Sequence, residues 1–257
     1  MSITIGEVRF SFVNLAEAKD LSDRKNIKYA SLEELREMPA DEAAKYKFSV
    51  NLIVPKNATV GKTGEKVLDR MQKAVNDAVD FAVSGKGKVK LPAEYAPTLK
   101  KLWADSGEML VVTKNKLKTV VRDGDTDNRS TDKEYLAGAI NFTADQYAVR
   151  RKTVTPVKTL APGAGVPVEI DPSEVYSGCY GYAVVTPYIY EYEYEGSFGL
   201  KFFVESVLKT RDGERLDGTV SAQAAYGDIL EAYADDASAA FGEVTEGGTE
   251  DTEAIFG

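Results

Sequence analysis

The order of apolar and polar residues predicts strands over much of the chain. Val8, Phe10 and Phe12 alternate with polar residues, and this period of two is typical of a strand with one buried face. The segment 46–54 has the same period, and Pro55 ends it because proline lacks the N–H that a β-ladder needs. Further strands are predicted at 114–121, 136–142, 178–194 and 200–210.

Helical periodicity is present in two places. Apolar residues recur at every third or fourth position between 65 and 83, and Gly85 follows, so a helix is predicted there. The polar segment 31–45 is also expected to be helical, because Ser31 followed by Glu34 has the pattern of a capping box. We expect a loop over 156–172 and a short helix over 222–241. Spaced strands with one well-defined helix indicate a mainly β barrel with helical inserts.

The composition restricts the functions that this fold could serve. Of the 257 residues, 43% are hydrophobic and 28% charged, as in ordinary globular proteins. The chain has no histidine, which excludes Ser-His-Asp triads, Cys-His pairs and HExxH zinc sites. Its one cysteine, Cys179, excludes a disulfide framework. Since neither a membrane-spanning run nor a secretory signal is recognisable, we expect a cytosolic protein without membrane partners.

The net charge of −9 is concentrated at the C-terminal end. Residues 228–257 contain nine acidic and no basic residues, which leaves 32 acidic and 32 basic residues in 1–227. We therefore divide the chain into a body, 1–227, and an acidic tail, 228–257, that should be disordered from about Gly242. Basic residues cluster in the body at 86–122 and 150–152. This arrangement suits a polyanion-binding body with a competing tail, although a solubilising tail would give the same pattern.

Two motifs resemble binding sites but lack essential residues. Gly61-Lys62-Thr63 matches the end of a phosphate-binding P-loop, yet Lys56 stands where the first glycine is required. Four acidic residues match ligand positions of a calcium-binding loop: Asp123, Asp125, Asp127 and Glu134. Asn128, however, replaces the glycine of its sharp turn, so a polar hairpin loop is favoured over a cation site. We expect no nucleotide, metal ion or other cofactor.

A row of tyrosines follows one predicted face of the segment 180–194. That face carries Tyr180, Tyr182, Tyr188, Tyr190, Tyr192 and Tyr194, whereas Ala183, Val185 and Ile189 lie on the other. The small apolar residues suit the barrel interior. An exposed aromatic row beside Lys and Arg could stack unpaired bases, each worth ~1–3 kcal/mol. Alternatively, the tyrosines pack beneath the inserted helices.

Several short motifs occur in a characteristic order along the chain. They are Val8-Arg-Phe-Ser11, Val54-Pro-Lys56, Val121-Arg-Asp-Gly-Asp125, Tyr176-Ser-Gly-Cys-Tyr-Gly181, Pro187-Tyr-Ile-Tyr190, Gly199 and Arg211-Asp-Gly-Glu-Arg-Leu-Asp-Gly218. Their sequence and order resemble those of the phage single-stranded DNA-binding proteins, over residues 6–226. The resemblance implies an OB-fold-like five-stranded barrel without enzymatic activity. Such a protein coats single-stranded DNA during phage replication, recombination or repair, in the cytoplasm of the infected bacterial host.

The alternation of side chains along the predicted strands and the positions of the basic residues, supported by this resemblance, indicate candidate DNA-binding residues. They are Tyr180, Tyr182, Tyr188, Tyr190, Lys201, Lys209, Arg211, Lys114, Lys116 and Arg150. Proteins of this kind commonly end in acidic residues followed by an aromatic residue that recruits replication proteins. Here Ile255 and Phe256 follow the acidic tail, so we expect them to bind phage or host replication proteins. A homodimer is compatible with these features, and the alternative function is a phage structural or self-assembling β protein.

Overall fold

A computed structural model describes residues 2–20, 22–23, 25–102, 112–113, 121–127, 133–191 and 197–216. The helix expected at 222–241, the boundary at 227/228 and the acidic tail lie outside these residues, as does most of the strand expected at 114–121. The described strands are β1 (Ile3–Asp20), β2 (Lys28–Ser31), β3 (Tyr46–Pro55), β4 (Val112–Thr113), β5 (Arg122–Asp123), β6 (Ala139–Tyr147), β7 (Val149–Arg150), β8 (Thr153–Val154), β9 (Lys158–Pro162), β10 (Pro167–Glu169), β11 (Tyr180–Glu191) and β12 (Ser197–Arg211). The α-helices are α1 (Leu32–Glu37), α2 (Ala40–Ala43), α3 (Val67–Val83) and α4 (Ala96–Leu99). Short 3₁₀ helices are η1 (Gly61–Thr63), η2 (Ala93–Tyr95), η3 (Glu134–Leu136) and η4 (Pro172–Glu174).

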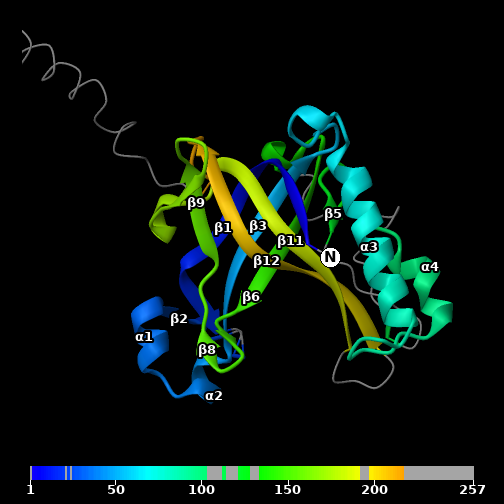
Figure 1. Cartoon of the computed structure of the whole chain (residues 1–257), viewed down its shortest axis with the longest axis horizontal. Coiled ribbons are helices and arrows are strands. Elements are labelled where there is room, and N and C mark those ends of the chain that lie inside the picture. Colours follow the sequence, from blue (N-terminus) through cyan, green and yellow to red (C-terminus); the bar gives the residue numbers. More distant parts are fainter. Residues whose placement is uncertain are drawn as a thin grey trace, which may run out of the picture. The chain divides into compact units, whose positions relative to one another are not determined.

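Five of the described strands close into a mixed barrel (Figure 1). β1 pairs antiparallel with both β3 and β11, β3 with β6, and β11 with β12. The circuit closes through a parallel pairing of β12 with β6, in which Phe202 lies opposite Ala144. The circuit β1-β3-β6-β12-β11 is that of an OB-type barrel, whose closure removes exposed strand edges. The prediction of a mainly β, five-stranded barrel with helical inserts is confirmed.

The inward faces of these strands form the core. Phe10, Phe48, Phe142 and Phe202 are fully buried, and the ring centroids of Phe142 and Phe202 lie 4.4 Å apart across the parallel pair. On β11, Ala183, Val185 and Ile189 are buried, as their parity predicted. Within the described ranges, no helix has both the length and the apolar character needed to span a membrane.

β1 departs from the alternation expected of it. Val8 and Phe10 are buried, but the side chain of Phe12 is 65% exposed and Ser11 is buried instead. The cause is a β-bulge: the pairing register with β3 shifts between Ser11 and Asn14, and Phe12 has a φ of 45°. An extra residue on one strand moves every later side chain to the other face. The prediction for Phe12 is therefore wrong.

The connections between barrel strands carry the helical inserts. The expected helix over 31–45 is two short helices, α1 and α2, separated by Pro39, and the capping box of Ser31 and Glu34 is formed. The helix expected over 65–83 is confirmed as α3, which contacts β11 and β1. The segment 156–172 is not a loop, because β9 and β10 form a hairpin there and β9 pairs parallel with β12. The glycine and proline residues of this segment are typical of a loop, and for this reason the two short strands were not predicted.

Candidate nucleic-acid interface

Tyrosines and lysine meet where β11 and β12 pair on the outside of the barrel. Tyr188 lies opposite Lys201, and Tyr190 lies opposite Gly199. The ring centroids of Tyr188 and Tyr190 are 6.3 Å apart, and Lys201 Nζ lies 4.9 Å from the Tyr190 centroid. A Cβ at Gly199 would lie 2.5 Å from Tyr190 Oη, so the ring lies directly across this glycine. Because Gly199 has no side chain, the Tyr190 ring can lie against the backbone at this position.

The neighbouring strands β6 and β3 continue this surface. Tyr147 lies opposite Lys47, whose Nζ is 4.1 Å from the Tyr147 ring centroid, and the tyrosine is 47% exposed. Next to them, the Arg150 guanidinium lies 4.5 Å from the ring centroid of Phe203 on β12. We call this surface the basic–aromatic face; it comprises Lys47, Tyr147, Arg150, Tyr188, Tyr190, Lys201 and Phe203.

The carboxylate of Asp145 lies among these residues. Asp145 Oδ2 is 3.5 Å from Lys47 Nζ and 4.0 Å from Lys201 Nζ, and the Asp145 side chain is 17% exposed. Burial, together with the negative charge and hydrogen bonding of Asp145, raises the pKa of Tyr188 well above its usual value. The Tyr188 hydroxyl is thus partly removed from solvent and lies beside this carboxylate.

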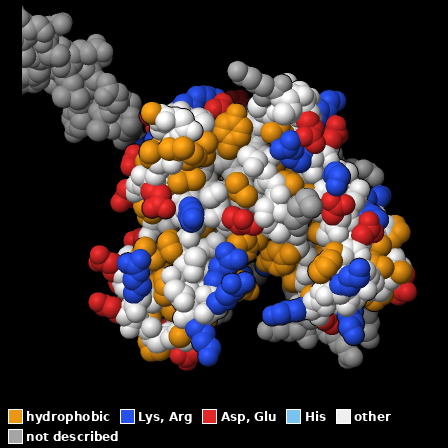
Figure 2. Space-filling model, viewed as in Figure 1, with side chains coloured by type: hydrophobic (Ala, Val, Ile, Leu, Met, Phe, Trp, Pro, Cys, Tyr) orange, Lys and Arg blue, Asp and Glu red, His pale blue; other side chains and the backbone are white. Residues whose placement is uncertain are grey.

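The basic–aromatic face adjoins the insert that carries α1 and α2, which directly precedes β3 and its Lys47. Figure 2 shows the molecule hollowed between the part that carries α1, α2 and β8 and the part that carries α3 and α4, with Lys and Arg side chains along the hollow. In OB folds, the face of the second and third strands, together with the loops after strands one and four, binds oligonucleotides.

A second group of tyrosines and cations lies at the other end of β11. The Arg211 guanidinium is 3.5 Å from the Tyr180 ring centroid, and Lys209 Nζ is 5.0 Å from that of Tyr176. Arg9 and Arg215 also lie over these two rings. We call this group the tyrosine–arginine clamp; it comprises Arg9, Tyr176, Tyr180, Lys209, Arg211 and Arg215.

The cations of the tyrosine–arginine clamp already hold partners. Arg211 pairs with Glu7 at 3.1 Å and Lys209 with Asp212 at 2.8 Å. Hydrogen bonds from Thr210 and Arg211 lower the pKa of Glu7, and hydrogen bonds from Lys209 and Tyr176 lower that of Asp212. Arg9 donates to the carbonyl oxygens of Gly178 and Glu214. These contacts join the segment before β11 to the segment after β12.

Glycines allow that close approach. At Gly178, where φ is +122°, a Cβ would lie 2.0 Å from the carbonyl oxygen of Glu214. A Cβ at Gly181 would lie 2.0 Å from the carbonyl oxygen of Leu208. These distances are far inside van der Waals contact, so side chains are sterically excluded. The glycines of the motif 176–181 therefore have a structural explanation.

The predicted site residues fall into separate groups. Tyr188, Tyr190, Lys201 and Arg150 lie together on the basic–aromatic face, whereas Tyr180, Lys209 and Arg211 belong to the tyrosine–arginine clamp. Tyr182 lies between the groups, with its ring against the backbone of Gly6. Lys114, Lys116, Ile255 and Phe256 lie outside the described residues. Four residues of this region were not predicted from the sequence: Lys47, Tyr147, Phe203 and Asp145. The alternation of side chains within each strand indicates that they point outward, but it does not indicate which strands lie next to one another.

The two motifs that resembled other binding sites have different roles. Lys56 Nζ lies 2.7 Å from Asp123 and 2.6 Å from Asp125, which makes this segment an ion-paired turn. Over the described ranges, the acidic and cysteine side chains form no cluster of three suited to a metal ion. Gly61-Lys62-Thr63 forms the 3₁₀ helix η1, and α3 begins only at Val67.

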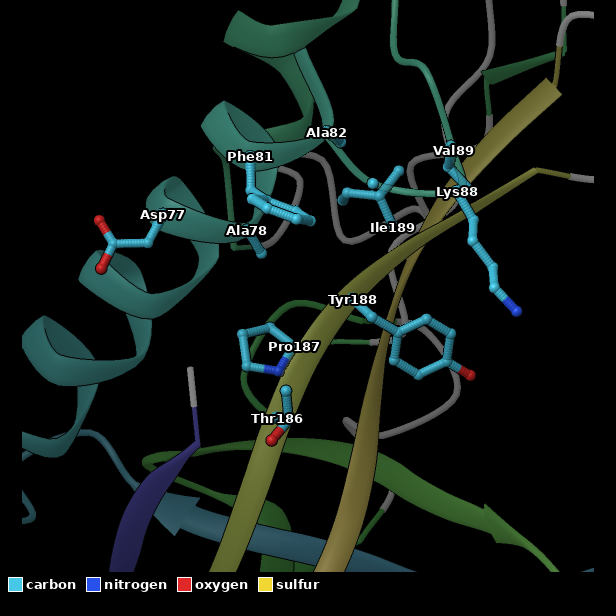
Figure 3. Close-up of a pocket in the computed structure, with 11 residues that line it drawn as sticks. Asp77, Ala78, Phe81, Ala82, Lys88, Val89, Thr186, Pro187, Tyr188 and Ile189 are labelled. Atoms are coloured by element: carbon cyan, nitrogen blue, oxygen red, sulfur yellow. The ribbon is translucent and has the colours of Figure 1, made fainter. Parts of the chain in front are cut away.

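An apolar cavity of about 500 Å³ lies between α3 and β11 (Figure 3). Phe81 and Ala82 of α3 face Ile189 of β11 across it, with Val89 at one side. Tyr188 lies at the edge of this cavity, and its hydroxyl points away from α3. The cavity is thus adjacent to the basic–aromatic face through Tyr188.

Comparison with known proteins finds one family and several solved structures that are similar to this chain. The sequence model of a family described as the single-stranded DNA-binding protein of Enterobacter phage Enc34 matches residues 27–238. The structure of that phage Enc34 protein in complex with single-stranded DNA is 20% identical, with a TM-score of 0.49 over 84% of this chain and 89% of that one. The structure of gp2.5, a single-stranded DNA-binding protein of bacteriophage T7, is 11% identical, with a TM-score of 0.44 over 98% and 99% of the two chains. No curated protein matches.

Proposed function

This chain belongs to the family of phage single-stranded DNA-binding proteins represented by that of Enterobacter phage Enc34, and from this premise we propose that it binds single-stranded DNA on the basic–aromatic face. Bound in this way, it coats single strands during phage DNA replication, recombination or repair in the cytoplasm of the infected bacterium. The single observation that supports the proposal most is the gathering of aromatic and basic side chains from five strands on one face, which includes the second and third strands of an OB-type barrel, β3 and β6.

Stacking can displace the cations that now cover the rings. Lys47, Arg150 and Lys201 lie over Tyr147, Phe203 and Tyr190, respectively. A cation–π contact at an exposed site contributes ~0.5–1 kcal/mol, whereas a stacked base contributes ~1–3 kcal/mol. Bases would therefore replace the cations on the rings, and the released cations would pair with the phosphates on either side. The aromatic rings of this face would thus supply base stacking, which tolerates any sequence, and its cations would supply the electrostatic part of binding.

The tyrosine–arginine clamp is proposed as a weaker, secondary contact. Lys209 and Arg211 must leave Asp212 and Glu7 before they can pair with phosphates. Tyr180 is likewise covered by Arg211. We therefore expect their substitution to reduce the salt dependence of binding less than substitution of Lys47 or Lys201. Tyr182, Lys114 and Lys116 remain predicted DNA contacts.

A salt titration tests the proposed function. Binding of fluorescent oligo-dT should weaken as salt rises, with a slope of log K against log[salt] of about −0.7 for each phosphate contact. Contacts by Lys47, Arg150 and Lys201 alone would give a slope of about −2, or roughly a 20-fold loss between 50 and 200 mM salt. The matching duplex should bind more weakly. No oligo-dT binding at 50 mM salt by the chain without residues 243–257 would overturn the proposal and favour a phage structural role.

We further propose that the acidic tail, 228–257, competes with DNA and recruits replication proteins. Its nine acidic residues can pair with the same Lys and Arg side chains as phosphates do, and tethering gives them a high effective concentration. Ile255 and Phe256 follow these acidic residues and have no solubilising role, so we assign them to partner binding. DNA that displaces the acidic residues would leave this apolar pair available to a polymerase, primase or nuclease.

Deletion of residues 243–257 should tighten oligo-dT binding at 50 mM salt, and the gain should shrink as salt screens the charges. Phe256→Ala should leave DNA affinity unchanged but weaken capture of purified phage or host replication proteins. Equal affinities with and without the tail at 50 mM salt would contradict competition, and undiminished capture by the Phe256 variant would contradict recruitment.

A further inference from the structure

The β7–β8 hairpin has an unusual turn. Arg150 pairs with Thr153, which leaves Arg151 and Lys152 as the two turn residues. Their φ angles are 50° and 69°, in the left-handed region that disfavours residues with a side chain. Phe12 is the only other non-glycine residue in the described part of the chain with a positive φ. Two adjacent residues of this kind in one turn, both of them cations, call for an explanation.

Local contacts do not explain these residues. A two-residue hairpin turn with both φ angles positive favours Asn-Gly, and a residue with a side chain costs roughly 1 kcal/mol at each such position. Both Arg151 and Lys152 are exposed. Within the described ranges, neither side chain forms an ion pair, a hydrogen bond or a ring contact. The strain is therefore not offset inside this part of the protein, and strain of this kind often marks a functional position.

The hairpin directly extends the basic–aromatic face. It follows β6, which carries Asp145 and Tyr147, and its first strand ends in Arg150, whose guanidinium lies over Phe203. Its base is fixed: Ala148 N–H donates to Tyr46 O at 2.9 Å, and Thr155 N–H donates to Ala148 O at 2.8 Å. Figure 1 shows β8 beside α1, at the end of β6. The turn is thus held at one edge of the face.

We infer that the β7–β8 turn is a phosphate clamp, in which Arg151 and Lys152 hold the backbone of a nucleic-acid strand whose bases stack on Phe203 and Tyr147. This inference rests on the proposed function and adds two contact residues to it. A two-residue turn directs both side chains outward from a narrow tip. Asn-Gly would relieve the backbone strain, but it would remove both positive charges from this edge of the face.

The inference predicts opposite changes in stability and binding. Replacing the turn by Arg151→Asn with Lys152→Gly should raise the melting temperature by a few degrees, because the strain is relieved. Oligo-dT affinity at 50 mM salt should fall roughly five- to twentyfold, and the salt slope should become shallower by about 1.4, the value for two phosphate contacts. Arg151→Gln with Lys152→Gln should lose the same affinity without the gain in stability, which separates charge from turn geometry.

The control is Lys66→Gln with Lys73→Gln, which removes two exposed cations from α3: Lys66 at its N-cap and Lys73, which pairs with Asp77. It should change affinity by less than twofold. Wild-type affinity and salt slope in both turn variants would overturn the inference while leaving the proposed function intact. A wild-type protein that fails to bind oligo-dT would overturn the proposed function and this inference with it. A lower melting temperature of the Asn-Gly variant would contradict the strain on which the inference depends.

Discussion

Replacement of Tyr188 and Tyr190 by alanine should each weaken oligo-dT binding by ~1–3 kcal/mol, which is roughly 5- to 150-fold. Both rings are half-buried on the outward face of β11, whereas Ala183, Val185 and Ile189 fill the interior. Removing them takes away stacking surface and leaves the barrel core intact. The double variant should lose somewhat less than the sum, because the two rings lie 6.3 Å apart and support one another.

Tyr188→Phe and Tyr29→Ala serve as controls for this prediction. Tyr188→Phe keeps the ring and removes only the hydroxyl contact with Asp145, so affinity should stay within a few-fold of wild type. Tyr29 is 52% exposed on β2 and lies outside the basic–aromatic face, and its replacement by alanine should have no effect. If the Tyr188 and Tyr190 variants unfold while the remaining folded molecules bind normally, the rings belong to the core rather than to the interface.

Asp145→Asn should tighten oligo-dT binding by roughly 5- to 30-fold. The carboxylate lies 3.5 Å from Lys47 Nζ, so a phosphate bound to the same ammonium group would approach it to about 6 Å. Repulsion between unit charges at that distance amounts to ~3 kcal/mol at the effective dielectric constant of ~20 near a protein surface, and screening by 50 mM salt reduces it to ~1–2 kcal/mol. Asparagine keeps the shape of the side chain and removes the charge. The salt slope should steepen, since Lys47 and Lys201 would no longer share their charge with Asp145.

The same substitution should lower the stability of the free protein by about 1 kcal/mol, because two half-buried lysines lose their ion pairs. Asp77→Asn on α3 is the matched control: it removes the same charge from an exposed pair with Lys73. Its effect on DNA affinity should be less than twofold. Weaker DNA binding by Asp145→Asn would show instead that Asp145 positions the two lysines for phosphate, and the competition argument would fail.

The sequence predicted correctly those features that depend on the pattern of a single strand. Period-two alternation located β3 and β11, and it placed Tyr188 and Tyr190 outside the barrel and Ile189 inside. It failed at Phe12, because a bulge is a property of two paired strands and leaves no mark on one. It also failed over 156–172, where two short strands are defined by their partners rather than by their own pattern.

The candidate site could be predicted only in part for the same reason. Lys47, Tyr147 and Phe203 come from three strands that are distant in sequence, and the parallel pairing of β12 with β6 brings them together. The periodicity of one strand does not indicate which other strand it pairs with, so this pairing could not be predicted. Asp145 could not be predicted as a site residue, because its effect on the site depends on its ion pairs with lysines from two other strands.

The order in which the barrel strands occur in the chain also determines when the protein can first act. Ile3 pairs with Val185, and the circuit is completed only by β12, which ends at Arg211. Contacts so distant in sequence make closure slow, on the millisecond-to-second scale typical of β barrels. At synthesis rates of ~5–20 residues per second, the ribosome needs roughly 10 to 40 s to reach Arg211. Until then the first strand can pair with β3 but the barrel is not closed and the surface for DNA is not assembled, so binding is acquired only after nearly the whole chain has been translated.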